Sequence, residues 1–367
     1  MSVPRPYGLY LHVPFCVRKC GYCAFFSEPY QEATAAAWLQ RMEQDLRTLP
    51  VGFQPDTVFW GGGTPTVLET ELLQRLLEAL HAHVDLSRVT EWTVEANPGT
   101  LTEEKAGLLR QGGVNRLSIG AQSFCSATLH RLGRIHTNVQ IREAVEWARS
   151  AGIHNISLDL IYGVPGVPLE EVQADVAAAQ SLEPSHLSCY ALEVEEGTPF
   201  AEAHRMGGLE LVEDDQRRQY EWIRHTLGEA GWTHYEISNF ARSGRECRHN
   251  LLYWMGGAYI GLGPSAHSHW NGARWGLTAT LPVWSRAFEE TLPPEAKACE
   301  TLVMGLRRLQ GWGREEFRSA SGFDYDALRG PEIDALVHDG LLLRGPDRIR
   351  LAPNALFVSN AAFSELV

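Results

Sequence analysis

The chain has 367 residues, 44% of them hydrophobic and 21% charged, with a net charge of −13 at pH 7. This length suggests about two domains with a large core, and the acidic charge argues against a general nucleic-acid-binding surface. The seven cysteines are odd in number and four are scattered, which suits a reducing compartment. We find neither a signal peptide nor an apolar run of membrane-spanning length. We therefore expect a cytoplasmic protein, for which peripheral contact with the inner face of the membrane stays open.

Strand-like and helix-like segments alternate from the N-terminus to about Val194. Apolar, branched runs predict strands over 8–13, 57–60, 91–95, 116–119, 155–161 and 186–192. Helical periodicity predicts helices over 34–49, 68–84, 103–111, 139–151 and 170–182. Such alternation predicts a parallel sheet with right-handed crossovers. Because six units are two short of a closed eight-fold barrel, we expect an α/β fold, a partial (β/α)6 barrel with an open side. A flat doubly wound sheet is the alternative.

Three cysteines follow the first predicted strand at C-x3-C-x2-C spacing, as Cys16, Cys20 and Cys23. A structural zinc site uses four ligands, and an iron–sulfur cubane usually takes four thiolates. Three thiolates on a cubane would leave one iron open, and an open iron can bind a substrate. The alternatives are a zinc loop with a distant fourth ligand, or three unconnected thiols.

Further polar or glycine-rich elements follow the next predicted strands, at 61–65, 96–98 and 120–122. Ligands of α/β sheets bind at the carboxyl ends of the strands. We therefore expect these elements and the cysteine loop to converge on one site.

The alternation ends after a charged helix predicted over 209–230. We expect a barrel domain over 1–232, an aromatic and glycine-rich connecting segment over 233–292, and a C-terminal domain over 293–367. In the last part the pattern predicts helices over 294–310 and 325–339 and a hairpin over 341–351, which together suggest a small, mainly helical, winged-helix-like domain. The acidic chain has no basic recognition helix, so a packing or lid role is favoured over DNA binding.

The cysteine loop, taken with the glycine loop one unit later, resembles the radical S-adenosylmethionine superfamily. The closest likeness is to its oxygen-independent coproporphyrinogen oxidase-like group. Six motifs in chain order carry the resemblance: 10–16 (YLHVPFC), 59–65 (FWGGGTP), 94–98 (VEANP), 118–123 (SIGAQS), 132–137 (LGRIHT) and 158–163 (LDLIYG).

The resemblance implies that the three cysteines hold a 4Fe-4S cluster whose open iron binds S-adenosylmethionine. It also implies a set of residues that contact this cofactor or a second copy of it: Tyr10, Tyr22, Gly61, Gly62, Gly63, Thr64, Glu95, Gln122, Arg134 and Asp159. Glycine lets a backbone approach a ligand closely, and a carboxylate accepts hydrogen bonds from ribose hydroxyls or an ammonium group. For the polar positions, Arg134 and Asp159 above all, the alternative is an ion pair at the barrel mouth or a cap on a strand end.

Two features separate the branches of this group. Oxidases carry a fourth cysteine two residues after the third, where this chain has Phe25. The run 249–254 reads H-N-x-x-Y-W and resembles the heme-chaperone branch, which implies heme binding through His249. Without that likeness, a hydrogen-bonded loop histidine would be the plainer interpretation. The resemblance thus implies a heme chaperone that serves apo-cytochromes of the respiratory chain, with no catalytic residue predicted. The alternative is an enzyme that oxidatively decarboxylates porphyrinogen propionates.

Overall fold

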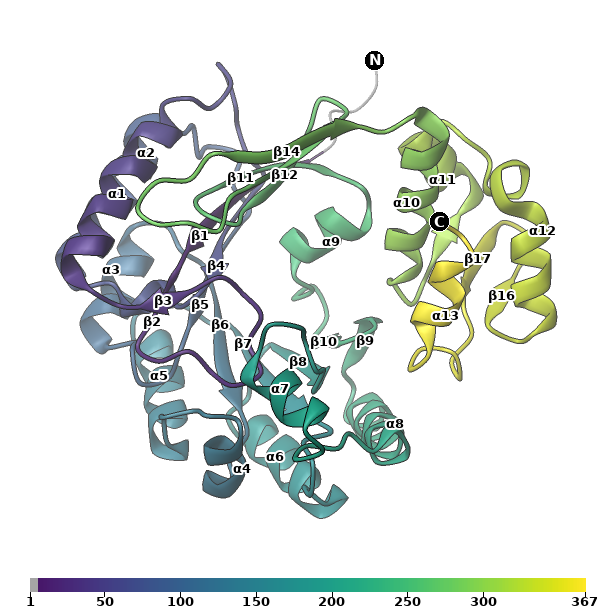
Figure 1. Ribbon diagram of the computed structural model, residues 1–367, viewed down its shortest axis with the longest axis horizontal. Coiled ribbons are helices and arrows are strands. Elements are labelled where there is room, and N and C mark those ends of the chain that lie inside the picture. The colour runs from purple at the N-terminus through teal and green to yellow at the C-terminus, as the bar shows by residue number, and fades with distance from the viewer. Residues whose placement is uncertain (1–5) are drawn as a thin grey trace.

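A computed structural model describes residues 6–367, and a 12-stranded mixed sheet forms its centre (Figure 1). Residues 1–5, the start of the expected barrel domain, lie outside the described residues. Parallel strands lie side by side in chain order: β1 (Tyr7–Val13), β4 (Thr57–Gly62), β5 (Glu91–Ala96), β6 (Arg116–Gln122), β7 (Asn155–Tyr162) and β8 (His186–Ala191). The order begins at one edge strand and ends at another, so the sheet is open. The predicted partial barrel is confirmed.

The connecting helices cover the outer face of these strands (Figure 1). They are α1 (Glu32–Leu46), α2 (Thr70–His83), α3 (Glu103–Gln111), α4 (Ser126–Arg131), α5 (Asn138–Ser150) and α6 (Leu169–Ser181), with the 3-10 turn η1 (Pro65–Val67) before α2. Leucines 72, 73, 76, 77 and 80 form one buried stripe of α2, as the helical period requires. Thr102 and Thr137 cap α3 and α5 by accepting backbone N–H bonds.

The segment 233–292 extends this same sheet at both edges. β11 (Ala258–Leu262) pairs parallel with β1 and leads to the antiparallel strands β12 (His267–Trp270), β13 (Ala273–Leu277) and β14 (Arg286–Thr291). β9 (Thr233–Glu236) and β10 (Asn239–Ala241) add to the other edge at β8. Helix α9 (Arg248–Trp254) lies between the two edges (Figure 1). We expected only a connection here, because these short strands carry His, Arg and Trp instead of regular apolar alternation.

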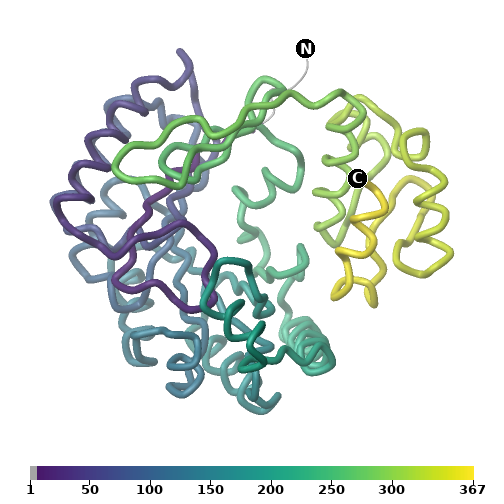
Figure 2. The backbone as a smooth tube through the Cα atoms, in the orientation of Figure 1, coloured from purple at the N-terminus to yellow at the C-terminus, as the bar shows by residue number. Residues whose placement is uncertain are grey.

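The C-terminal part contains α10 (Pro294–Leu306), α11 (Arg314–Ser321), α12 (Tyr325–His338) and α13 (Ser359–Ser364). A three-stranded sheet joins them in the order β15 (Trp312–Gly313), β17 (Arg348–Leu351), β16 (Leu342–Arg344). The sequence predicts α10, α12 and the β16–β17 hairpin, whereas α11, α13 and β15 were not predicted. Between β8 and this part the chain includes α7 (Pro199–Arg205) and α8 (Glu213–Glu229), and the β12–β14 ribbon leads directly into α10. Figure 2 shows the C-terminal part, coloured from green to yellow, across from the purple N-terminal segments.

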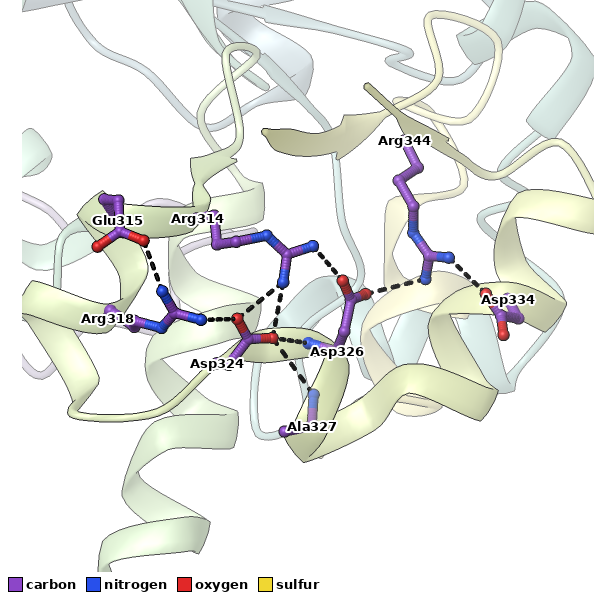
Figure 3. A network of polar contacts seen from close by, with 8 residues as sticks. All are labelled: Arg314, Glu315, Arg318, Asp324, Asp326, Ala327, Asp334 and Arg344. Carbon is purple, nitrogen blue, oxygen red and sulfur yellow. Dashed lines mark hydrogen bonds and ion pairs between the residues drawn. The ribbon is translucent and has the colours of Figure 1, made fainter. Parts of the chain in front are cut away.

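A network of ion pairs fixes the C-terminal part internally (Figure 3). Arg314 and Arg318 of α11 bind Asp324, whose Oδ1 also accepts the N–H of Asp326 at the start of α12. Arg344 of β16 binds Asp326 and Asp334. The network therefore joins α11, α12 and β16.

Among the helices of residues 6–367, none is both long enough and apolar enough to cross a membrane.

Candidate functional site

Two adjoining cavities open at the carboxyl ends of the parallel strands. The first, which we call the cysteine cavity, measures about 850 Å³ and is lined by Cys16, Cys20 and Cys23. The second, which we call the aromatic cavity, measures about 820 Å³ and is lined by residues of α9, β11 and β12. Both volumes are in the range of small-molecule and cofactor sites. The residues that line both cavities form their common wall: Ala24, Phe25, Phe59, Gly62, Glu95 and Asn250.

The cysteine loop is held by a short pairing of β2 (Phe15–Cys16) with β3 (Glu28–Pro29). Cys16 Sγ lies 3.6 Å from Thr64 Oγ1, and Arg134 Nη1 donates to Cys20 Sγ at 3.6 Å. Burial raises the pKa of the Cys23 thiol. Three thiols on one cavity, with a guanidinium beside them, fit a cluster held by three cysteines. The other cysteines line neither cavity.

The zinc alternative has no assembled site in the described part of the chain. In residues 6–367 no three Cys, His, Asp or Glu side chains converge on a point where one metal ion could bind. A cubane differs from a zinc site in this respect, because its cysteines bind separate irons. We therefore retain the cluster interpretation for the three cysteines.

The glycines at the end of β4 and directly after it meet a packing requirement that the sequence did not indicate. A Cβ on Gly61 would lie 2.8 Å from the Glu95 carboxylate, and one on Gly63 would lie 2.6 Å from the Phe15 carbonyl oxygen. Gly62 has φ +99°, and its Cβ would overlap the His12 ring. Close packing between protein segments thus requires these glycines. Gly62 and Gly63 line the cysteine cavity, whereas Gly61 lines neither cavity.

Glu95 is a half-buried carboxyl group on the wall between the cavities. Its Oε2 accepts the Gly62 N–H at 3.2 Å. Burial, and then the charge of Asp159, raises the pKa of Glu95 to about 8. The carboxyl group is therefore largely protonated at neutral pH and can ionise when a cation binds beside it.

Tyr10 reaches the aromatic cavity instead of the cysteine cavity. Its hydroxyl lies 3.1 Å from His12 Nδ1, and His12 Nε2 donates to the Phe26 carbonyl oxygen at 2.8 Å. Burial lowers the pKa of His12 to about 4, so the ring is neutral. This chain of hydrogen bonds fixes the end of the cysteine loop to β1, and the Tyr10 ring stacks on Phe59.

Arg134 has polar partners, and none of them is a carboxylate. Its Nη2 donates to the Gly120 carbonyl oxygen at 2.8 Å and to Asn97 Oδ1, and Asn97 Nδ2 donates to Thr64 Oγ1 at 2.7 Å. The chain Arg134–Asn97–Thr64 thereby joins Cys20 to Cys16. Our sequence analysis did not single out Asn97, although it lies in the motif 94–98. Among the described residues Arg134 forms no ion pair, and its bond to the Gly120 carbonyl oxygen near the end of β6 matches the strand-end cap instead.

The far wall of the cysteine cavity carries Asp159 and Gln122. Asp159 accepts from Ser118 and Ser157 at 3.1 Å, and burial raises its pKa. Gln122 has φ +64° at a register shift between β6 and β7, a strained position for a residue other than glycine. Arg116, 2% exposed, lines the same wall. The sequence analysis missed it because it lies inside a predicted strand.

Tyr22 also lines the cysteine cavity, next to Phe200 of α7. The rings contact edge to face at 6.2 Å. Burial raises the pKa of Tyr22, so its hydroxyl stays protonated. The segment after β8 therefore closes over the cysteine loop.

His249 is buried in α9, with both ring nitrogens in hydrogen bonds. Nδ1 lies 2.8 Å from Thr57 Oγ1, and Nε2 lies 2.7 Å from the Tyr253 hydroxyl. Its ring stacks on Phe59 at 5.2 Å, and burial lowers its pKa to about 3. The H-N-x-x-Y-W run thus forms a wall of the aromatic cavity. Binding of iron at Nε2 would require Tyr253 to release it.

The site can be compared with known proteins. Residues 10–179 match the model of the radical SAM superfamily. The heme chaperone HemW of Lactococcus lactis is 34% identical over 99% of this chain and 98% of its own length. HemW of Escherichia coli is 35% identical over 93% of each chain. The solved structure of coproporphyrinogen III oxidase (HemN) from Escherichia coli, a radical SAM enzyme, matches with a TM-score of 0.84 over 99% of this chain and 90% of that one, at 20% identity, which is a likeness of fold. The chain therefore belongs to the HemW family of heme chaperones and carries that family's radical SAM domain.

Proposed function

We propose that this protein carries heme, next to a 4Fe-4S cluster and S-adenosylmethionine, and delivers the heme to apo-cytochromes of the respiratory chain. One observation carries the proposal: the three-thiol cavity adjoins a second, largely aromatic cavity of similar volume. The second cavity is lined by the H-N-x-x-Y-W run, and flat aromatic walls suit a macrocycle. The full-length relatives named as heme chaperones support the same conclusion.

In this proposal the cysteine cavity holds the cluster and S-adenosylmethionine. Cys16, Cys20 and Cys23 hold the cluster, which supplies an iron that the amino and carboxylate groups of S-adenosylmethionine can coordinate. Arg134 stabilises the thiolate of Cys20, and Thr64 orients Cys16. Around this cofactor the chain offers Tyr22, Gln122, Asp159 and the glycine loop.

Phe25 distinguishes the carrier from the oxidase alternative. It stands where the oxidase branch has a fourth cysteine, and its side chain is 69% exposed on the wall between the cavities. A large exposed aromatic ring at this place can pack on a porphyrin face. It supplies no thiol for chemistry. We therefore propose that coproporphyrinogen oxidation is not an activity of this protein.

The affinity for S-adenosylmethionine should increase with pH through Glu95. The pKa of this carboxyl group is raised to about 8 in the free protein, and the cofactor is a sulfonium cation. The bound cofactor favours the ionised carboxylate of Glu95. Below pH 8 binding must therefore displace the proton of this carboxyl group, whereas well above pH 8 the group has already lost it. We expect affinity to rise about tenfold between pH 7 and pH 9, with proton release at pH 7. Calorimetry in buffers of different ionisation enthalpy measures both quantities.

Glu95→Gln is the matched control for this pH dependence. Its amide oxygen can still accept the Gly62 N–H, so the loop should keep its shape. The variant should bind more weakly at pH 9 and lose most of the pH dependence. Any slope that it retains belongs to Asp159 of the same cavity or to the amino group of the cofactor. An unchanged slope in the variant would exclude Glu95 as the titrating group.

Heme binding without turnover is the test of the proposed function. Anaerobically reconstituted protein should bind hemin with a saturable Soret band. The same sample should convert coproporphyrinogen far more slowly than about 1 per second, the low end of ordinary enzyme rates. Conversion at that rate or faster, without saturable hemin binding, would favour the oxidase alternative.

We further propose that the heme acceptors lie at the inner face of the membrane and that the carrier meets them by peripheral contact. An acidic chain with a net charge of −13 is poorly suited to electrostatic attachment to anionic lipids. The contact would therefore be made through the acceptor protein. Co-sedimentation with membranes that contain or lack the acceptor would distinguish these cases.

A further inference from the structure

The aromatic cavity is also lined by His269 of β12, a half-buried histidine whose environment differs from that of His249. His269 Nδ1 lies 3.3 Å from the Gly257 carbonyl oxygen, so Nδ1 carries the hydrogen. Its Nε2 is buried and has no hydrogen-bond partner. A histidine whose Nδ1 donates to a backbone carbonyl presents Nε2 as a free lone pair, the arrangement in which histidine binds metals.

Four histidines line the aromatic cavity, and their partners differ. His12 is bonded at both ring nitrogens, to Tyr10 and Phe26. Both nitrogens of His249 already bond to hydroxyl groups. His267 is exposed, and its ring packs at 5.6 Å from Phe288. His269 combines a fixed ring with an unpartnered Nε2. Burial, then the charge of Lys297, lowers the pKa of His269, which keeps the ring neutral.

Positive charge lies directly beside His269. Arg274 of β13 is its cross-strand partner in the sheet and lines the same cavity. Directly opposed residues have neighbouring side chains on one face of a sheet. Arg274 bonds to Glu290 at 2.7 Å and to Glu300 of α10, which lines the cavity as well. A carboxylate ligand could exchange with one of these glutamates at the guanidinium.

The remaining walls suit a flat apolar body. Tyr253 and Tyr259 contact edge to face at 4.5 Å, and the Tyr259 ring lies 6.5 Å from the His269 ring. The Nε1 of Trp254 is a second buried polar atom on this cavity without a partner. Unpartnered indole Nε1 atoms also occur at Trp38 and Trp60, so the Trp254 atom by itself does not mark a ligand site. His269 Nε2 is the lone pair on this cavity that a metal-containing ligand could use.

We propose that the heme occupies the aromatic cavity with its iron bound to Nε2 of His269 and its propionates at Arg274. This inference rests on the proposed function, because it presupposes that the protein binds heme. His249 then shapes the cavity wall through Thr57 and Tyr253 and does not bind the iron. Because Nε2 is shielded from solvent, the iron reaches it only after neighbouring side chains shift.

The iron–histidine bond gives a direct test. Reconstituted protein loaded with hemin and then reduced should show an iron–imidazole stretching band in resonance Raman spectra. His269→Gly should lose the band and at least tenfold in heme affinity, and added imidazole should restore the band. His249→Gln should keep the band. His225→Ala is the surface control, since this residue on α8 pairs only with Glu229. Cluster absorption in each variant checks the fold.

The propionate contact has its own test. Arg274→Gln should weaken binding of heme severalfold but leave binding of heme dimethyl ester unchanged, because the ester lacks the carboxylates. Arg286→Gln is the matched control: Arg286 lies on β14, pairs with Glu289 of the same strand and lines neither cavity. Equal losses for heme and its ester in Arg274→Gln would exclude the propionate contact.

The outcomes separate the two levels of inference. Loss of the band in His269→Gly, with recovery by imidazole, supports the assignment. The assignment of His269 is wrong if His269→Gly retains the band. It is also wrong if the band is lost in His249→Gln alone or in His267→Ala alone. In each of these cases heme binding itself would stand. Absence of heme binding by the unmodified protein overturns the proposed function itself.

Discussion

Replacement of Cys20 by serine should abolish the visible absorption of the reconstituted cluster. The unmodified protein should contain about four irons per chain, as a cubane requires. Cys20 is one of three thiols on the cysteine cavity and accepts from Arg134, so no other cysteine of the cavity can replace it. A serine hydroxyl stays protonated near neutral pH and binds iron poorly. Iron analysis and absorption spectroscopy under anaerobic conditions measure the effect.

Cys125→Ser is the control for this variant. Cys125 is also half-buried, stands at the start of α4 and lines neither cavity. It should keep the full iron content and absorption. A full cluster in Cys20→Ser would refute the three-cysteine assignment. Loss of iron in both variants would indicate that the effect of serine is not specific to the site.

Gly62→Val should destabilise the folded protein and not merely weaken S-adenosylmethionine binding. The position has φ +99°, where a branched side chain is strained, and its Cβ would overlap the His12 ring. Backbone strain costs about 1–3 kcal/mol, and overpacking costs about 1–3 kcal/mol more. The sum, about 2–6 kcal/mol, is a large part of the stability of a typical domain. Urea unfolding of the cluster-free protein measures the loss.

Gly244→Val separates the two contributions. This exposed glycine has φ +74°, and a Cβ there would meet nothing within 4 Å. It should therefore cost the backbone strain alone. If Gly62→Val were as stable as the unmodified protein and had lost only cofactor binding, the glycine loop would serve ligand approach, as its sequence first indicated.

The parallel strands could be predicted because their sequences are apolar runs that both faces of the sheet bury. Val58 and Leu117, for example, are fully buried. The strands β12–β14 could not, because they form an antiparallel ribbon with mixed residues, and every residue of β14 is exposed. Their pairing depends on the prior position of β11 beside β1.

The residues of the candidate site could likewise be predicted only in part. Cysteine spacing and the place of polar residues after strands predicted where the cysteine cavity lies. The family resemblance supplied the cofactor residues, of which Tyr10 and Gly61 do not line this cavity. The partners of His249 could not be predicted, because Thr57 lies 192 residues away along the chain. The conformation of Gly62 likewise depends on His12 of a different strand. Contacts of this kind exist only after the sheet has formed.

Heme transfer is the most direct measurement of the central claim. Reconstituted protein loaded with one equivalent of heme should be mixed with an apo-cytochrome, and the two should be separated by size. We predict that the heme moves to the acceptor, whose own Soret spectrum appears as that of the carrier declines. Free hemin at the same concentration and heme-loaded serum albumin serve as controls. Heme that stays on the carrier in the presence of cofactor and acceptor would contradict the account.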